Sequence, residues 1–287
     1  MAKRILVLLA SMTNIFVRAA KRAGGFHGKS VFHGTFIVLG PTGSGKSTFI
    51  NSLISDDTSD MPASTCSSSA SCTKSVLFHS GPQWSCSEPT GWFQRVSEDC
   101  EKLGTVQFDF FDTVGLDAQD MSGQNNTSNL FMNLTEEIVA QVPAVNGIVL
   151  VHKMERYRKG FAEELRRIFE MFELFGVKPQ HVLLVITNSL IFTEQVRQNY
   201  TKSLVDALAS PFVTLTNALH VNFVTLDEVQ PHFREFALQT WQEQTKEVYL
   251  KLRQFRGTFN PTAWVLKQAD FKRHLEKIYA CKSDTGC

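Results

Sequence analysis

Short apolar runs alternate with segments of helical periodicity along most of this chain, which is typical of a largely parallel β-sheet covered by helices. The expected strands are 35–39, 75–79, 105–111, 147–152, 181–187 and 220–225. The expected helices are 46–54, 133–141, 160–175, 193–209, 232–253 and 262–280. The pattern therefore predicts an α/β fold of three layers, with a mostly parallel six-stranded sheet and a C-terminal helical extension.

The first expected strand runs directly into a glycine-rich turn, TFIVLGPTGSGKST over residues 35–48. This is a P-loop, in which glycines let backbone N–H groups point at the phosphates of a nucleotide and the next helix adds its positive end. In that pattern Lys46 reaches the β- and γ-phosphates, and the Ser47 hydroxyl binds Mg²⁺. Without phosphate, we expect Lys46 to be exposed to solvent. The candidate nucleotide-binding residues of the loop are Gly40, Pro41, Thr42, Gly43, Ser44, Gly45, Lys46, Ser47 and Thr48.

A second phosphate motif follows the third expected strand, where VQFDFF leads into DTVG. Asp112 at this strand end can hold Mg²⁺ through a water, and the Gly115 N–H can meet a γ-phosphate. The loop could then distinguish a triphosphate from a diphosphate. Taken alone, these four residues are also common turn chemistry, but a P-loop upstream at this interval favours the nucleotide interpretation.

Charge is distributed unevenly along the chain. The net charge is +1, but the first acidic residue is Asp56, so the segment ahead of it carries +7 and the remainder −6. The body of the chain therefore does not suggest a nucleic-acid partner. The six cysteines show neither a CxxC pair nor the spacing of a zinc site, which favours a reduced intracellular protein.

Residues 1–30 are basic and free of acids, with a short apolar stretch between the charges. They resemble an organelle transit peptide and, less well, a secretory signal. They also suit an amphipathic helix on an anionic membrane surface, or a helix that packs on the domain ahead of the first strand. We expect a cytoplasmic or peripheral membrane protein, with organelle targeting as the alternative.

The motifs GPTGSGKST, SCTKSV and DTVG, followed by GIVLVHKMERYRKGFAEELRRIFEMF and HVLLVITNSL, resemble the AIG-type (GIMAP-like, immunity-associated) G domains. Those domains are relatives of septins and of the Toc import receptors within the P-loop GTPases. The chain is also similar to fungal proteins that carry a single AIG-type G domain. The resemblance covers residues 35–228 and implies a G domain there, while the charge and apolar patterns indicate a basic N-terminal segment at 1–34 and a helical extension at 229–287.

The resemblance also implies roles for individual residues. Thr73 is implied as the switch threonine that completes the Mg²⁺ shell with Ser47 and Asp112, and Thr65 is the alternative. Lys46, Thr73 and Gly115 are implied to act in hydrolysis. The family further implies a homodimer across the nucleotide face, in which the partner supplies polar groups.

Two positions depart from the family pattern. The box that reads guanine usually has a basic residue and then a carboxylate, whereas this chain has Asn188 and, two residues on, Leu190. Asn188 and the loop 225–228 could bond a base edge or could be turn residues, so guanine specificity is not shown by the sequence. Leu116 stands after Gly115, where Ras-type enzymes carry the glutamine that orients the attacking water, which predicts slow hydrolysis.

Three further residues are candidates for the site. Asp117 and Asp120 are close enough in sequence to position water, and His152 follows the fourth expected strand. The predicted function is a molecular switch that binds GTP with Mg²⁺, with ATP not excluded, and acts as a weak GTPase. The alternatives are a nucleotide-binding scaffold without turnover and an ATPase.

Overall fold

The computed structural model describes most of the predicted domain and none of residues 1–30. The described residues are 31–55, 62–65, 73, 75–85, 104–116, 137, 144–154, 169, 172, 176–189, 191–208, 217–223, 229–260 and 273. The predicted helices 133–141, 160–175 and 262–280 lie almost entirely outside them, as do Asp117, Asp120, Leu190 and the loop 225–228.

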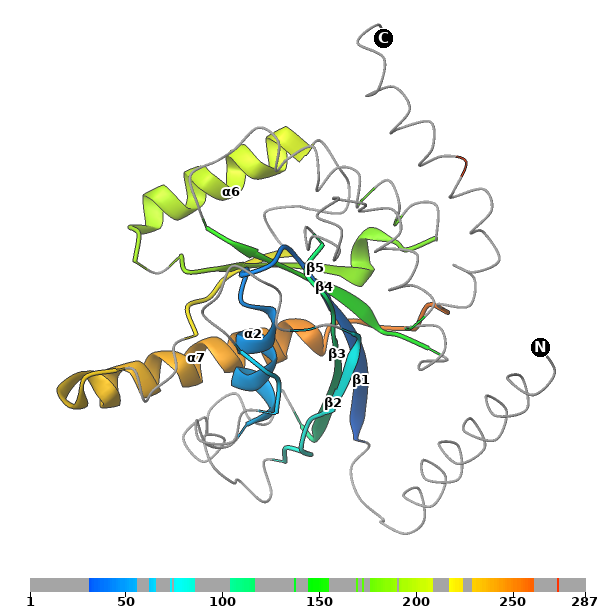
Figure 1. The fold of residues 1–287 in the computed structure, drawn as a ribbon, viewed down its shortest axis with the longest axis horizontal. Coiled ribbons are helices and arrows are strands. Elements are labelled where there is room, and N and C mark those ends of the chain that lie inside the picture. Colours follow the sequence, from blue (N-terminus) through cyan, green and yellow to red (C-terminus); the bar gives the residue numbers. More distant parts are fainter. Residues whose placement is uncertain are drawn as a thin grey trace, which may run out of the picture. The chain divides into compact units, whose positions relative to one another are not determined.

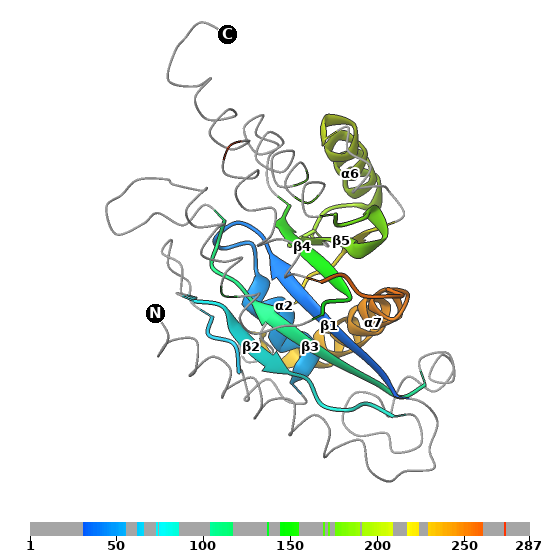
Figure 2. The same ribbon diagram turned by 90° about the vertical axis from the view of Figure 1, so that its right-hand side faces the viewer.

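Six strands form one sheet in the order β2-β3-β1-β4-β5-β6, and all neighbours are parallel except β2 and β3 (Figures 1 and 2). The strands are β1 (Phe32–Leu39), β2 (Leu77–Ser80), β3 (Val106–Asp112), β4 (Gly147–Lys153), β5 (Val182–Thr187) and β6 (Ala218–His220). The predicted mostly parallel, six-stranded sheet is therefore confirmed.

Three α-helices and two 3-10 turns accompany the sheet in the described part of the chain. The helices are α2 (Lys46–Ile54), α6 (Glu194–Leu208) and α7 (Arg234–Leu252), and the 3-10 turns are Pro179–His181 and Pro231–Phe233. The bounds of α2 are those predicted. The helix expected over 232–253 instead opens with a 3-10 turn, because Pro231 supplies a fixed φ at the first position and no N–H.

The two faces of the sheet bury separate hydrophobic clusters, since successive side chains of a strand point to opposite faces. On one face Phe36 and Val38 of β1 pack with α2 and α7, and on the other Ile37 and Leu39 pack with Leu204 of α6. Figure 1 shows α2 and α7 on one side of the sheet and α6 on the other. The three-layer prediction is confirmed.

Helix α7 is part of the core and not an appendage to it. Its Val248, Tyr249 and Leu252 are fully or almost fully buried against the sheet and α2. The Trp84 indole N–H donates to the Tyr249 hydroxyl at 2.6 Å, and that hydroxyl donates to the Leu53 carbonyl at the end of α2. The sheet also begins at Phe32, ahead of the predicted domain boundary at residue 35.

The prediction of a strand over 220–225 is wrong at residues 221–223, which follow the end of β6, and residues 224 and 225 lie outside the described residues. The Val221 N–H still bonds the Ile186 carbonyl of β5, but the next N–H, of Asn222, donates to the Gln244 side chain of α7. Successive N–H groups of a strand point to opposite sides, so this N–H faces away from β5, and the Gln244 side chain satisfies it at the outer edge of β6. No helix in the described part of the chain is long and apolar enough to cross a membrane.

The His152 side chain, near the end of β4, is buried against α6. Only 6% of it is exposed, and its Nε2 lies 2.6 Å from the Tyr200 hydroxyl of α6, with the two rings stacked. Burial lowers the pKa of the imidazole from its ordinary 6.5 to about 4, so His152 is neutral at physiological pH.

This burial predicts acid sensitivity. As the pH falls below 6.5, the unfolded chain takes up a proton on His152 that the folded chain refuses until about pH 4. The free energy of unfolding should therefore fall across that window, by up to about 3 kcal/mol at its acid end. His152→Gln keeps a polar partner for Tyr200 but cannot ionise, so it should flatten the difference between urea unfolding at pH 7.5 and at pH 4.5. His232→Gln, at an exposed position, is the control. Equal pH dependence in wild type and His152→Gln would contradict the assignment.

Candidate nucleotide and magnesium site

The turn between β1 and α2 has the backbone of a P-loop. Gly40 lies so close to β4 that a Cβ at this position would stand 2.1 Å from the Val151 carbonyl oxygen, so only glycine fits. Gly45, with a φ of 91°, is the N-cap of α2, and no side chain caps the helix there. The first turn of α2 also contains no acidic residue. The positive end of the helix dipole at this turn suits a phosphate.

Lys46 lies inside the turn. It is only 7% exposed, and its Nζ donates to the carbonyl oxygens of Gly40 at 3.2 Å and Pro41 at 3.0 Å. The expectation that Lys46 is exposed without phosphate is therefore wrong. The reason is that the curled turn presents its own carbonyls to the ammonium, and these compensate its desolvation.

The Asp112 carboxylate at the end of β3 joins the predicted metal-binding residues. One of its oxygens, Oδ2, accepts hydrogen bonds from the Ser47 hydroxyl at 2.7 Å and the Thr73 hydroxyl at 3.2 Å. Asp112 is fully buried and Thr73 is 6% exposed. Ser47, Thr73 and Asp112 were predicted from three separate motifs, and the fold brings them together. Thr65, the alternative to Thr73, is exposed and bonds none of them.

The other carboxylate oxygen, Asp112 Oδ1, is buried and has no hydrogen-bond partner among the described residues. A buried carboxylate with an unsatisfied oxygen is costly, and a cation or a metal-bound water would relieve that cost. Hard oxygen groups of this kind, one carboxylate with two hydroxyls, suit Mg²⁺. The described residues contain no cluster of three or more His, Cys, Asp or Glu that could hold another metal. The residues present therefore fit Mg²⁺ at Asp112.

The chain leading from α2 toward Thr73 is fixed at one point by a residue that the sequence did not single out. The Asn51 carboxamide of α2 donates to the Ala63 carbonyl and accepts from the Ala63 N–H, both at 2.8 Å, and both residues are buried. Beyond Thr73, the Val76 N–H donates to Glu137 at 2.6 Å. Thr73 thus lies between two fixed points that are independent of the metal-binding residues.

The DTVG loop lies directly against the P-loop. A Cβ on Gly115 would stand 2.0 Å from the Thr42 hydroxyl oxygen, so this close approach requires glycine. The next N–H, of Leu116, donates to the Gly40 carbonyl at 3.1 Å. The Leu116 side chain is 7% exposed and belongs to the core cluster under α6. Leu116 therefore anchors the loop and offers no polar group to a water.

On the other side of the P-loop, Thr187 at the end of β5 bonds the P-loop, and Asn188 follows it with an unusual backbone conformation. The Thr187 hydroxyl donates to the Ser44 carbonyl at 2.7 Å, which ties the end of β5 to the P-loop. Asn188 is half-buried, and it is the only described non-glycine residue with a positive φ, 54°. A strained residue of this kind is often found at a binding site. Thr187 had no predicted role, and only its place as a hydroxyl residue at a strand end hinted at one.

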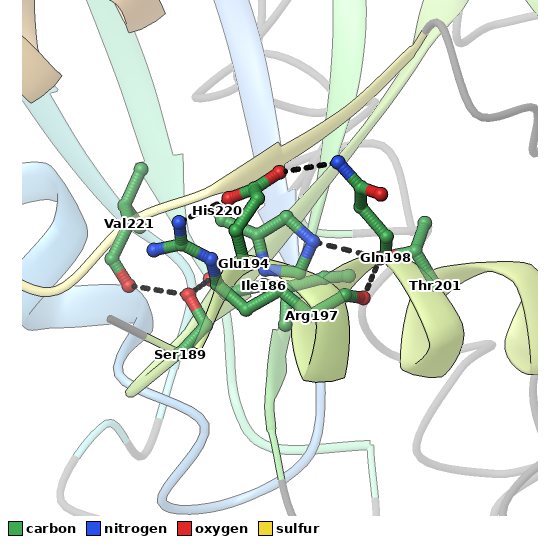
Figure 3. A network of polar contacts seen from close by, with 8 residues as sticks. All are labelled: Ile186, Ser189, Glu194, Arg197, Gln198, Thr201, His220 and Val221. Atoms are coloured by element: carbon green, nitrogen blue, oxygen red, sulfur yellow. Dashed lines mark hydrogen bonds and ion pairs between the residues drawn. The ribbon is translucent and has the colours of Figure 1, made fainter. Parts of the chain in front are cut away.

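Ser189 fixes the loop after β5 to the chain after β6. It is fully buried, and its hydroxyl lies within hydrogen-bond distance of the carbonyls of Ile186, at 3.1 Å, and Val221, at 3.4 Å. Figure 3 shows this contact beside the first turns of α6, where Glu194 pairs with Arg197 and bonds Gln198. Polar contacts thus tie the loops after β5 and β6 together at the carboxyl edge of the sheet.

Comparison with known proteins identifies the fold. No family model matches the chain, and no curated protein sequence matches it. Among solved structures, the chain is similar to Toc33 from Arabidopsis thaliana, both as a dimerisation-deficient mutant and in complex with GDP and Mg²⁺. Each is 14% identical with a TM-score of 0.51, over 88% of this chain and 95% of Toc33. Toc33 with Mg²⁺ and GMPPNP is 13% identical with a TM-score of 0.50 over the same shares. At such identities the likeness shows the fold alone: the P-loop α/β fold of a G domain.

Proposed function

We propose that this chain is a molecular switch that binds GTP with Mg²⁺ and hydrolyses it slowly. The observation that carries the proposal is the convergence of Ser47 and Thr73 on one oxygen of Asp112, while the other oxygen has no hydrogen-bond partner among the residues that the structure describes. In this proposal Ser47 and Thr73 hold the cation directly and Asp112 holds it through a water. Bound Mg²⁺ would neutralise charge on the β- and γ-phosphates.

Guanine is the proposed base because the Toc33 structures of this fold contain GDP or GMPPNP with Mg²⁺. The chain's own residues do not choose between GTP and ATP. Thr187 ends β5 and is followed by Asn188 and Ser189, none of the three side chains is charged, and Ser189 is fully buried. The finer likeness, to immunity-associated and single-domain fungal G domains, rests on the sequence motifs.

We expect the Thr73 hydroxyl to strengthen binding of a triphosphate but not of a diphosphate. Thr73→Val removes the hydroxyl that meets Asp112, so affinity for Mg²⁺ with a non-hydrolysable GTP analogue should fall about tenfold while GDP affinity stays unchanged. Thr65→Val, at an exposed threonine in the same part of the chain, is the matched control and should change neither. Isothermal titration of the three proteins tests this. An equal loss for GTP analogue and GDP would remove Thr73 from the switch, and absence of any nucleotide binding in the wild type would overturn the proposed function.

Slow turnover follows from Leu116, whose burial leaves that position without a group to orient water. One of the similar structures is a dimerisation-deficient mutant of Toc33, which points to dimerisation in that protein. We therefore propose that this chain forms a homodimer across the nucleotide face, in which the partner supplies the missing polar groups. Phosphate release per molecule should then rise with protein concentration until the dimer saturates. Specific activity that stays flat over a hundredfold dilution, in protein that sedimentation shows to dimerise, would contradict help from a partner. No release at any concentration would favour the non-hydrolysing scaffold.

We also propose that the basic segment 1–30 governs localisation by contact with an anionic membrane surface. Each basic residue near such a surface contributes about 1 kcal/mol, and Lys3, Arg4, Arg18, Lys21 and Arg22 all lie in this segment. Deletion of residues 1–30 should release the protein from vesicles that contain phosphatidylserine and leave GTP affinity unchanged, as flotation and titration would measure. Equal vesicle binding by the two forms would refute the proposal.

A further inference from the structure

The chain after β6 is held on three sides although it leaves the sheet. The Val221 N–H donates to the Ile186 carbonyl of β5 at 2.9 Å, and the Asn222 N–H donates to Oε1 of Gln244 at 2.6 Å. The Phe223 ring lies 6.1 Å from the ring of Phe49 in α2. Residues 221–223 therefore contact β5, α7 and α2 within three consecutive positions.

Gln244 is an unusual residue for the middle of a helix that packs on a core. It is 8% exposed, and its Oε1 is used by Asn222 while its Nε2 has no hydrogen-bond partner in the part of the chain that the structure describes. A buried amide group left unpaired costs stability, so an apolar side chain would pack better at this position. The hydrogen bond to Asn222 is what the glutamine provides and a leucine or methionine would not.

Two residues that follow Gln244 on α7 bond α2, the helix that begins at the P-loop. The Thr245 hydroxyl lies 3.5 Å from the Ser52 carbonyl, and the Tyr249 hydroxyl donates to the Leu53 carbonyl. Both carbonyls belong to the last turn of α2, whose first turn is the P-loop. One helix thus contacts the loop after β6 through Gln244 and the phosphate-binding helix through Thr245 and Tyr249. Figure 1 shows α7 running beside α2 on this face of the sheet.

The order of the strands separates the P-loop from the chain after β6. The P-loop follows β1, and β5 and β6 are the second and third strands from it on one side. At about 4.8 Å per strand, the loop after β6 lies roughly 14 Å from the P-loop along the sheet, whereas Thr187 at the end of β5 bonds Ser44 of the P-loop. Ligands of open parallel sheets bind at this carboxyl edge, so phosphates at the P-loop place the base near these loops. The contact of Ser189 with Val221 in Figure 3 makes the two loops one wall.

We infer that Gln244 of α7 is a positioning residue for the base half of the nucleotide site: by holding the Asn222 backbone, it fixes the wall against which the purine lies. The inference rests on the proposed nucleotide binding. Gln244 hydrogen-bonds the chain after β6 and, among the described residues, no residue of the P-loop, so its effect is expected on ligands that carry a base.

The test compares a ligand with a base and one without. Affinities of the full chain for Mg²⁺ with GTP, ATP and inorganic tripolyphosphate would be measured by titration calorimetry. Gln244→Met keeps the volume and removes the acceptor, and it should weaken both nucleotides about tenfold while leaving tripolyphosphate affinity unchanged. Gln239→Met, at an exposed glutamine of the same helix, is the matched control and should change none of the three.

The outcomes are distinguishable. If Gln244→Met binds all three ligands as the wild type does, or loses all three equally, Gln244 has no role specific to the base and the inference is overturned. If that variant fails to fold, Gln244→Asn, which withdraws the acceptor by one methylene group and stays polar, should show the same selective loss. A wild type that binds tripolyphosphate and nucleotides equally tightly would also overturn the inference, whereas one that binds none of them overturns the proposed function itself.

Discussion

The candidate site depends on the hydrogen bonds that converge on the buried carboxylate of Asp112. The parallel pairing of β1 and β3 sets Asp112 opposite Val38, one residue from the end of β1, so the carboxylate lies beside the P-loop. There it accepts from Ser47, in the first turn of α2, and from Thr73, which precedes β2. This group links the P-loop helix and the chain at Thr73 by two hydrogen bonds. Two segments that a nucleotide switch must connect are thus connected through one side chain.

The parts of the site that the sequence could predict are those encoded within a few consecutive residues. The P-loop and DTVG are short motifs whose backbone geometry follows from their own glycines, and the preceding strands are continuous apolar runs. The choice between Thr73 and Thr65 came from a resemblance, and of these two threonines Thr73 is the one whose hydroxyl donates to Asp112. The exposure expected of Lys46 was wrong because it depends on where the carbonyls of a curled turn point, which no periodicity encodes.

The contacts that sequence reasoning missed join residues far apart in the chain. Thr187 bonds Ser44, 143 residues away, and Tyr249 bonds Leu53, 196 residues away. Threonine at a strand end and tyrosine in a helix are both common, so the residue type alone does not indicate a long-range contact. The contact of the chain after β6 was missed for the same reason, because Gln244, which accepts from the Asn222 N–H, lies on a helix that begins 14 residues after His220. Only the packing of α7 against α2 brings that acceptor into place.

The burial of Leu116 constrains how any hydrolysis could proceed. A polar residue in its place could turn toward a water, but the leucine side chain lies in the apolar cluster under α6 while its N–H bonds the P-loop at Gly40. To bring this side chain to the phosphates, the loop would have to give up both the burial and the hydrogen bond. The burial and the hydrogen bond therefore hold the DTVG loop in place, with Gly115 against Thr42. A group that orients the attacking water must then come from another part of this chain or from a second copy, and the position after Gly115 serves to hold the loop on the P-loop.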